Sequence, residues 1–164
     1  MTETDSRQAE EPMSADPTQI EVDFMILADG AQAVGGKLFM LGGGWTHMFV
    51  PQFPGKPPAP FAVAVGITVP YHLTNRRFTF ALELTDSDGA RVGDVLTAEM
   101  EQGRPPGLRP GTSQPILIAV NAQPEFPGPG RYTFNATIDG EPLRSASFEA
   151  VALTPPTPAT PQVE

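Results

Sequence analysis

Apolar and polar residues alternate along much of this 164-residue chain. The clearest stretch is residues 78–84, where the alternate apolar positions are Phe78, Phe80, Leu82 and Leu84. The same period begins at residue 20, where the predicted buried set is Ile20, Val22, Phe24 and Ile26. It recurs over residues 116–120 and 132–138. A period of two predicts strands that bury one face, and no stretch shows the 3.6-residue period of an amphipathic helix.

Turn signals separate these stretches. Gly35-Gly36 predicts a tight hairpin, because both central positions of a type I′ turn need positive φ, and Asp139-Gly140 is a second hairpin signal. Residues 86–89 (DSDG) predict a polar turn leading into a strand over residues 91–100. Residues 61–69 are nearly continuously apolar, which predicts a central strand buried on both faces.

The spacing of strands and turns predicts the fold class. About eight or nine short strands, with a turn signal every ten or so residues, is the rhythm of an antiparallel β-sandwich or barrel. We therefore expect an all-β fold, with an immunoglobulin-like β-sandwich as the first choice and a jelly-roll-like sandwich as the alternative. The predicted domain covers residues 20–153.

The two ends of the chain differ from this domain. Residues 1–19 carry five acidic residues and one arginine, with two methionines as their only large apolar residues. Residues 154–164 (TPPTPATPQVE) are rich in proline and threonine. Neither segment has enough apolar surface to offset the entropy of ordering, so the sequence predicts disordered N- and C-terminal tails.

Charge and composition narrow the classes of partner. The net charge is −9, which argues against binding nucleic acid or anionic membrane, since both require clustered Lys and Arg. The chain has no cysteine, which leaves the redox compartment open. Because it has no basic-then-apolar leader and only strand-length apolar runs, we expect a cytoplasmic protein. Arginine outnumbers lysine eight to two, and Ala, Pro and Gly are abundant, a bias that suggests a high-GC bacterial genome.

Motifs for catalysis and metal binding are missing from the sequence. Residues 86–97 lack the sixth-position glycine and twelfth-position glutamate of a calcium loop. The two histidines, His47 and His72, have no second ligand at a useful strand spacing, and no nucleophile motif is present. We therefore expect neither a metal, nor a cofactor, nor an enzyme.

Arginines in loops are the first candidate site. The predicted residues are Arg76, Arg77, Arg104 and Arg109. Loops at the end of a sandwich often carry binding sites, and guanidinium groups bind carboxylates and other anions in a bidentate manner. The alternative is that these arginines form ion pairs with nearby acids: Asp86, Asp88 or Glu101.

Trp45 is the second candidate, since it is the single tryptophan and follows three glycines at residues 42–44. The glycines suggest a bulge or a close backbone approach. An exposed indole could stack on a sugar or a protein partner. More often, a lone tryptophan in a strand is a core residue, and that is the preferred interpretation.

A combination of motifs resembles an uncharacterised bacterial family of short proteins. The motifs are ILAD at residues 26–29, Gln32, GKL at 36–38, LGGGW at 41–45, NRR at 75–77 and GRPPG at 103–107. The resemblance covers about residues 24–150. It implies one intact domain and adds no catalytic residue.

The leading functional hypothesis is a non-catalytic module that binds an unknown protein partner or another copy of itself. The first alternative is a small-ligand binder for an anion or a carbohydrate. It requires Arg76, Arg104, Arg109 and Trp45 to converge on one concave surface. The second alternative is a hydrolase with a dispersed site, which requires a buried cluster of acids with a histidine.

Overall fold

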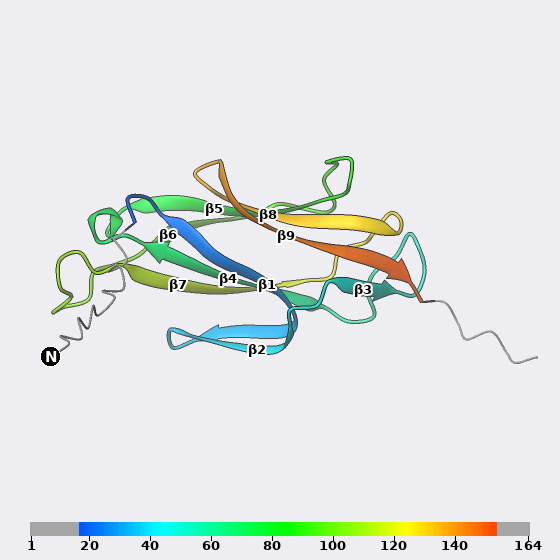
Figure 1. Ribbon diagram of the computed structural model, residues 1–164, viewed down its shortest axis with the longest axis horizontal. Helices are drawn as coiled ribbons and strands as arrows, with labels where there is room; N and C mark the ends of the chain where they lie inside the picture. The colour runs from blue at the N-terminus through cyan, green and yellow to red at the C-terminus, as the bar shows by residue number, and fades with distance from the viewer. Residues whose placement is uncertain (1–16, 154–164) are drawn as a thin grey trace, which may run out of the picture.

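Two β-sheets lie face to face in the computed structural model, which describes residues 17–153 (Figure 1). In spatial order, sheet A contains β2 (Lys37–Gly43), β1 (Glu21–Val34), β4 (Phe61–Val69) and β7 (Gln114–Ala122). Sheet B contains β3 (His47–Val50), β9 (Glu141–Ala152), β8 (Gly130–Ile138), β5 (Arg77–Thr85) and β6 (Leu96–Glu101). The prediction of an all-β protein is confirmed for this part of the chain. The predicted tails fall almost entirely outside it.

All neighbouring strands are antiparallel except β3 and β9, which are parallel. Within residues 17–153 the one helical element is a 3₁₀ turn, η1 (Tyr71–Leu73), so this part of the chain contains no helix that could span a lipid bilayer. Strands that are far apart in the sequence lie side by side in the sheets. For example, β4 pairs with β7.

The core lies between the sheets. In β4 every residue except Thr68 is buried, as the continuous apolar run predicted. On β5 and β8 burial alternates, so that Phe80 and Phe134 join the core cluster while Thr79 and Thr133 are only partly covered. The predicted register of β5 is therefore confirmed.

The predicted buried face of β1 is wrong beyond its first residues. The pairing with β4 shifts between Val22 and Phe24, which reverses the side on which the following side chains lie. Met25 and Leu27 are buried instead of Phe24 and Ile26. The ring of Phe24 covers Gly66, where a Cβ atom would overlap it.

The strand predicted over residues 91–100 is shorter in the structure and begins at Leu96. The turn before it is held by Asp86, whose Oδ1 accepts hydrogen bonds from the backbone N–H of Asp88 at 2.9 Å and of Ala90 at 2.8 Å. After the turn, Arg91 contacts β5: its Nε donates a hydrogen bond to Glu83 Oε1 at 2.8 Å. Together with the hydrogen bond that the Val92 N–H donates to the Leu84 carbonyl at 2.8 Å, this contact holds Arg91 and Val92 against β5 ahead of β6.

β1 is long enough to pair with two different strands. Residues 21–28 pair with β4, and residues 28–34 pair with β2. The second half of β1 and all of β2 thus form a hairpin, residues 29–43, which is hydrogen-bonded to the rest of sheet A only where β1 continues into its pairing with β4. We call this hairpin the arm. It lies at the lower edge of the molecule in Figure 1 and approaches the end of β7 at Asn121.

Candidate functional site

Three of the four candidate arginines gather at one end of the sandwich, where the chain leaves β4 and enters β5. Arg76 and Arg77 lie at the start of β5, and Arg104 lies in the loop after β6. The backbone N–H of Asn75 donates to the carbonyl of Gln102 at 2.8 Å, which joins the two segments. The structure therefore brings Arg104 beside the Asn75-Arg76-Arg77 turn.

Arg104 uses its guanidinium to hold that end together. Its Nε and Nη2 donate to Thr74 Oγ1 at 3.0 and 2.8 Å, and Nη2 also donates to the carbonyl of Tyr71 at 3.0 Å. Its Cζ lies 3.9 Å from the centroid of the Tyr71 ring. Since the donors on this side already have partners, Arg104 serves the structure of the η1 turn and offers little to an incoming anion.

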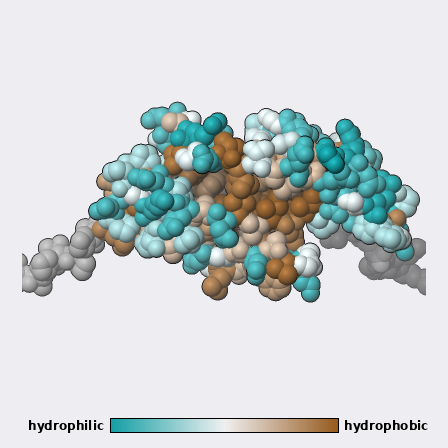
Figure 2. All heavy atoms as spheres, turned by 180° about the vertical axis from the view of Figure 1, so that it is seen from behind, coloured by the Kyte–Doolittle hydropathy of each residue, from teal (hydrophilic) through white to brown (hydrophobic). Residues whose placement is uncertain are grey.

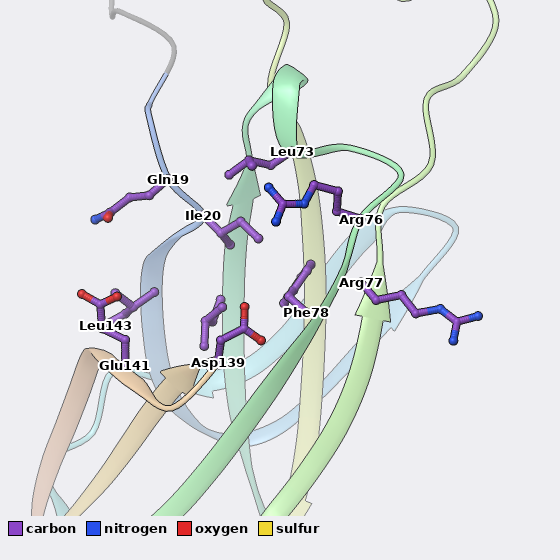
Figure 3. Close-up of a pocket in the computed structure, with 10 residues that line it drawn as sticks. Gln19, Ile20, Leu73, Arg76, Arg77, Phe78, Asp139, Glu141 and Leu143 are labelled. Atoms are coloured by element: carbon purple, nitrogen blue, oxygen red, sulfur yellow. The ribbon is translucent and has the colours of Figure 1, made fainter.

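Arg76 and Arg77 point in different directions (Figure 3). Arg77 points away from the hollow and pairs with Glu101 on β6, with 3.5 Å between Nε and Oε2. Arg76 points toward the hollow, which has a volume of about 220 Å³, and it has no ion pair within residues 17–153. The predicted ion pairing with Glu101 thus applies to Arg77.

The hollow beside Arg76 has mixed chemistry. Its apolar lining comes from sheet B, η1 and the residue before β1: Ile20, Leu73, Phe78, Ile138 and Leu143. Asp139 and Glu141 line the other side, and Asp139 Oδ1 accepts from the backbone N–H of Thr79 at 2.8 Å. An anion entering the hollow would meet two carboxylates with one arginine, so the hollow is poorly suited to bind it.

Arg104 gives a testable consequence of this arrangement. Arg104→Ala is expected to lower the unfolding free energy by about 1–2 kcal/mol, because a charge-assisted hydrogen-bond group is lost from a partly exposed turn. The matched control is Arg109→Ala, since Arg109 is exposed in the same loop and forms no ion pair in the described chain. It should stay within about 0.5 kcal/mol of wild type. Urea unfolding measures the unfolding free energies of both variants. Equal values for Arg104→Ala and Arg109→Ala would contradict the structural role of Arg104.

Trp45 lies at the opposite end of the sandwich and belongs to an aromatic cluster. Its ring centroid is 5.5 Å from that of Phe61 and 5.7 Å from that of Phe148, both edge-on. Phe61 begins β4, whereas the arginines follow the end of the same strand. Trp45 and the arginines therefore do not converge, and the four-residue ligand site is not formed.

The indole nitrogen of Trp45 is unusual because it is buried without a hydrogen-bond partner. Beside it, a hollow of about 740 Å³ opens between the base of the arm and the loop before β4. Asp29, His47 and Phe49 also line this hollow. Gly42 has φ 60°, and a Cβ atom there would overlap the side chain of Asp29, so glycine is required for this close approach.

The arm carries the most exposed apolar surface of the described residues. Phe39 is 58% exposed and Leu41 is 75% exposed, and with Val34 they lie on one face of the hairpin. Figure 2 shows apolar atoms at the lower edge of the molecule, on the side where Figure 1 places the arm. This exposed surface was not predicted from the sequence. The available signal was the unbroken apolar run of residues 38–41, because a strand covered on one face should alternate.

The histidines and acids make no metal site within residues 17–153, where no three potential ligands come together. His72 Nε2 lies 3.1 Å from the carbonyl of Thr18, and His47 Nδ1 lies 3.0 Å from Thr46 Oγ1. In both cases the partner of the histidine is an oxygen atom of a threonine.

The sequence from β1 to β9, which includes the arm and both ends described above, matches a known family. Residues 23–151 match the sequence profile of DUF6941, a family of unknown function. The chain belongs to DUF6941. The sequence-based expectation of an uncharacterised family is thereby confirmed, and the DUF6941 match assigns no activity to any residue.

Other comparisons add little to the DUF6941 assignment. No curated protein matches the chain. Among solved structures, the chain is similar to the Pseudomonas fluorescens alkylpurine DNA glycosylase AlkC bound to DNA containing an abasic site analog, with 10% sequence identity and a TM-score of 0.47. The similarity covers 80% of this chain and 30% of that chain. It carries no argument about function here.

Proposed function

We propose that this protein is a non-catalytic protein-interaction module that binds through its arm. The observation that supports the proposal is the distribution of exposed large apolar side chains. Of the seven such residues between positions 17 and 153, five lie between positions 34 and 49. Four are on the arm, and the fifth, Phe49, is on β3 and lines the hollow at its base.

The size of this surface is that of a binding site. Phenylalanine side chains bury about 150–250 Å² when covered, so Phe39 and Phe49, each more than half exposed, offer roughly 200 Å² together. The smaller side chains of Val34 and Leu41, with Met40 on the other face of the hairpin, bring the total to on the order of 400 Å². Patches of about 300–600 Å² are the largest on typical monomers and are often functional. Covering this surface with a protein partner would remove it from water, which is the main favourable term in association.

We also propose that the sandwich is immunoglobulin-like. The orders β1-β4-β7 and β9-β8-β5 correspond to strands A-B-E and G-F-C of that fold. Tyr132, near the start of β8, donates its hydroxyl to the carbonyl of Gly128 at 2.6 Å, as the tyrosine corner before strand F does. Folds of this kind commonly present loops and edges to partners. The jelly-roll alternative has no comparable support.

The alternative functions have weaker support. A small-ligand site would need the arginines and Trp45 on one surface, yet they lie at opposite ends of β4. A hydrolase would need clustered acids with a histidine, and the two contacts of His47 and His72 are with Thr46 and Thr18. These observations favour a protein-binding role over small-ligand binding or hydrolysis.

Site-specific photo-crosslinking tests the proposal. A photoreactive phenylalanine analogue at Leu41 of the full-length chain, expressed in its native cell, is expected to form covalent adducts with a protein. The matched control places the same probe at Leu96, which is 42% exposed on β6 and outside the arm. Adducts at Leu41 alone support the proposal. Adducts at neither position, or at Leu96 only, overturn it.

A further inference from the structure

The free edge of β2 shows which backbone groups a partner would meet. The arm turns at Gly35-Gly36, with φ of 57° and 71°, and Val34 pairs with Lys37 immediately after the turn. Hydrogen-bonded and non-bonded pairs alternate along an antiparallel hairpin from that closing pair. The backbone N–H and C=O groups of Leu38 and Met40 therefore point away from β1, toward the open edge.

The other sheet edges are less suited to pairing. β6 carries Glu99 and Glu101, β3 has four residues, and β7 has Pro115 near its start and no exposed large apolar side chain. Charges, proline and short length are the features that keep natural edges from pairing. β2 has a single charge, Lys37 at its first position, and no proline. It is the least protected edge of the described chain.

We propose that two copies of the protein pair through β2, antiparallel and centred on Met40, so that their A sheets join into one continuous sheet. This inference rests on the proposed function, because it names the partner of the arm as a second copy. The two-fold axis would place Met40 opposite its counterpart and Phe39 opposite Leu41 of the other copy. Such a contact is isologous and closes on itself, which limits the assembly to a dimer.

The charges of β2 suit self-pairing. In this register Lys37 lies opposite Gly43 of the other copy, and Leu38 lies opposite Gly42. No like charges face each other across the new pair, although the whole chain has a net charge of −9. Self-pairing of β6 would bring its glutamates close together, which destabilises a strand pair. Electrostatics therefore favour β2 as the edge at which identical acidic copies meet.

The available area predicts a reversible dimer. The exposed large apolar side chains of the arm, Val34, Phe39, Met40 and Leu41, offer on the order of 300 Å² per copy, well below the roughly 800 Å² per partner of standard stable interfaces. Strand pairing adds backbone hydrogen bonds to this apolar contact. We expect dissociation constants on the order of micromolar, so that monomer and dimer exchange with concentration.

Sedimentation velocity on the full-length chain across the micromolar range tests the pairing. The wild type is expected to shift from monomer to dimer as concentration rises. Met40→Pro removes the outward N–H at the centre of the pair without removing a donor to β1, so it should weaken dimerisation at least tenfold. Met40→Ala retains that N–H and is the matched control. It should dimerise more strongly than Met40→Pro, and circular dichroism should show both variants folded.

A disulfide provides a second measurement that does not depend on destabilising the arm. The chain contains no cysteine, so Met40→Cys introduces a single thiol. Residues opposite each other in a hydrogen-bonded antiparallel pair have Cα atoms about 5.5 Å apart, within disulfide range. Mild oxidation should convert most Met40→Cys protein to a covalent dimer. Leu96→Cys is the control, since Leu96 is 42% exposed and Met40 is 40% exposed, and it should remain largely monomeric.

The outcomes separate this inference from the proposed function. Concentration-dependent dimers that Met40→Pro weakens, together with selective crosslinking of Met40→Cys, support pairing through β2. A wild type that stays monomeric up to high micromolar concentration overturns it. Equal dimerisation of Met40→Pro and wild type also overturns it. If Leu41 probes then capture a different protein, the interaction function stands without self-pairing, and if they capture nothing, both proposals fail.

Discussion

Phe148→Ala is expected to lower the unfolding free energy by about 3–5 kcal/mol, the usual cost of truncating a fully buried phenylalanine. Phe148 is 2% exposed. Its ring lies between 5.7 and 6.1 Å, centroid to centroid, from five other aromatic rings: Trp45, Phe61, Phe126, Tyr132 and Phe134. These rings come from both sheets and two loops, so the cavity would weaken contacts on several sides at once.

Urea unfolding followed by circular dichroism measures this loss. The control is Phe49→Ala, because Phe49 is also a strand phenylalanine but is 54% exposed. It should change the unfolding free energy by no more than about 0.5 kcal/mol. Similar losses for the two variants would show that the aromatic cluster does not form the centre of the core.

Trp45→Ala is expected to cost about 3 kcal/mol, at the lower end of the range for aromatic truncation because Trp45 is partly covered rather than fully buried. The lost contacts are the edge-on packing against Phe61 and Phe148. Trp45→Phe should cost much less, about 1 kcal/mol. It keeps an aromatic ring in the cluster and removes the indole N–H, which is buried without a partner and so carries a desolvation penalty.

The order of the two Trp45 variants distinguishes a core residue from a surface binding residue. In the wild type, the fluorescence of the single tryptophan should be blue-shifted and weakly quenched by acrylamide. Ready quenching, combined with a Trp45→Ala protein as stable as wild type, would contradict the core assignment. That result would revive stacking on a sugar or a protein as the role of Trp45.

The sequence by itself determined the strands and several turns. The alternation in β5 and β8 correctly assigned Phe80 and Phe134 to the core, because the side-chain period of a strand is a local property of the backbone. The hairpin at Gly35-Gly36 was predicted for the same kind of reason, since positive φ at two successive positions depends on those two residues. Neither inference needed information from distant parts of the chain.

The candidate site could not be derived in this way. The partners of Arg104 are Tyr71 and Thr74, about thirty positions earlier, and no sequence spacing reveals that these segments meet. The separation of Trp45 from the arginines likewise follows from the length and direction of β4. Composition suggested which residue types bind ligands, but only the tertiary structure showed which donors were already occupied.

The arm shows most clearly what tertiary structure decided. Residues 38–41 have the composition of a core strand, and hydrophobicity along the chain does not distinguish a strand that is covered from one that is not. The pairing of β1 first with β4 and then with β2 leaves this apolar segment on an open edge. A single irregularity at Val22 and Phe24 sets which face of β1 is buried, and it depends on β4 as much as on β1 itself. Whether a side chain is exposed thus depends on which strands, distant in the sequence, pack beside it in the folded protein.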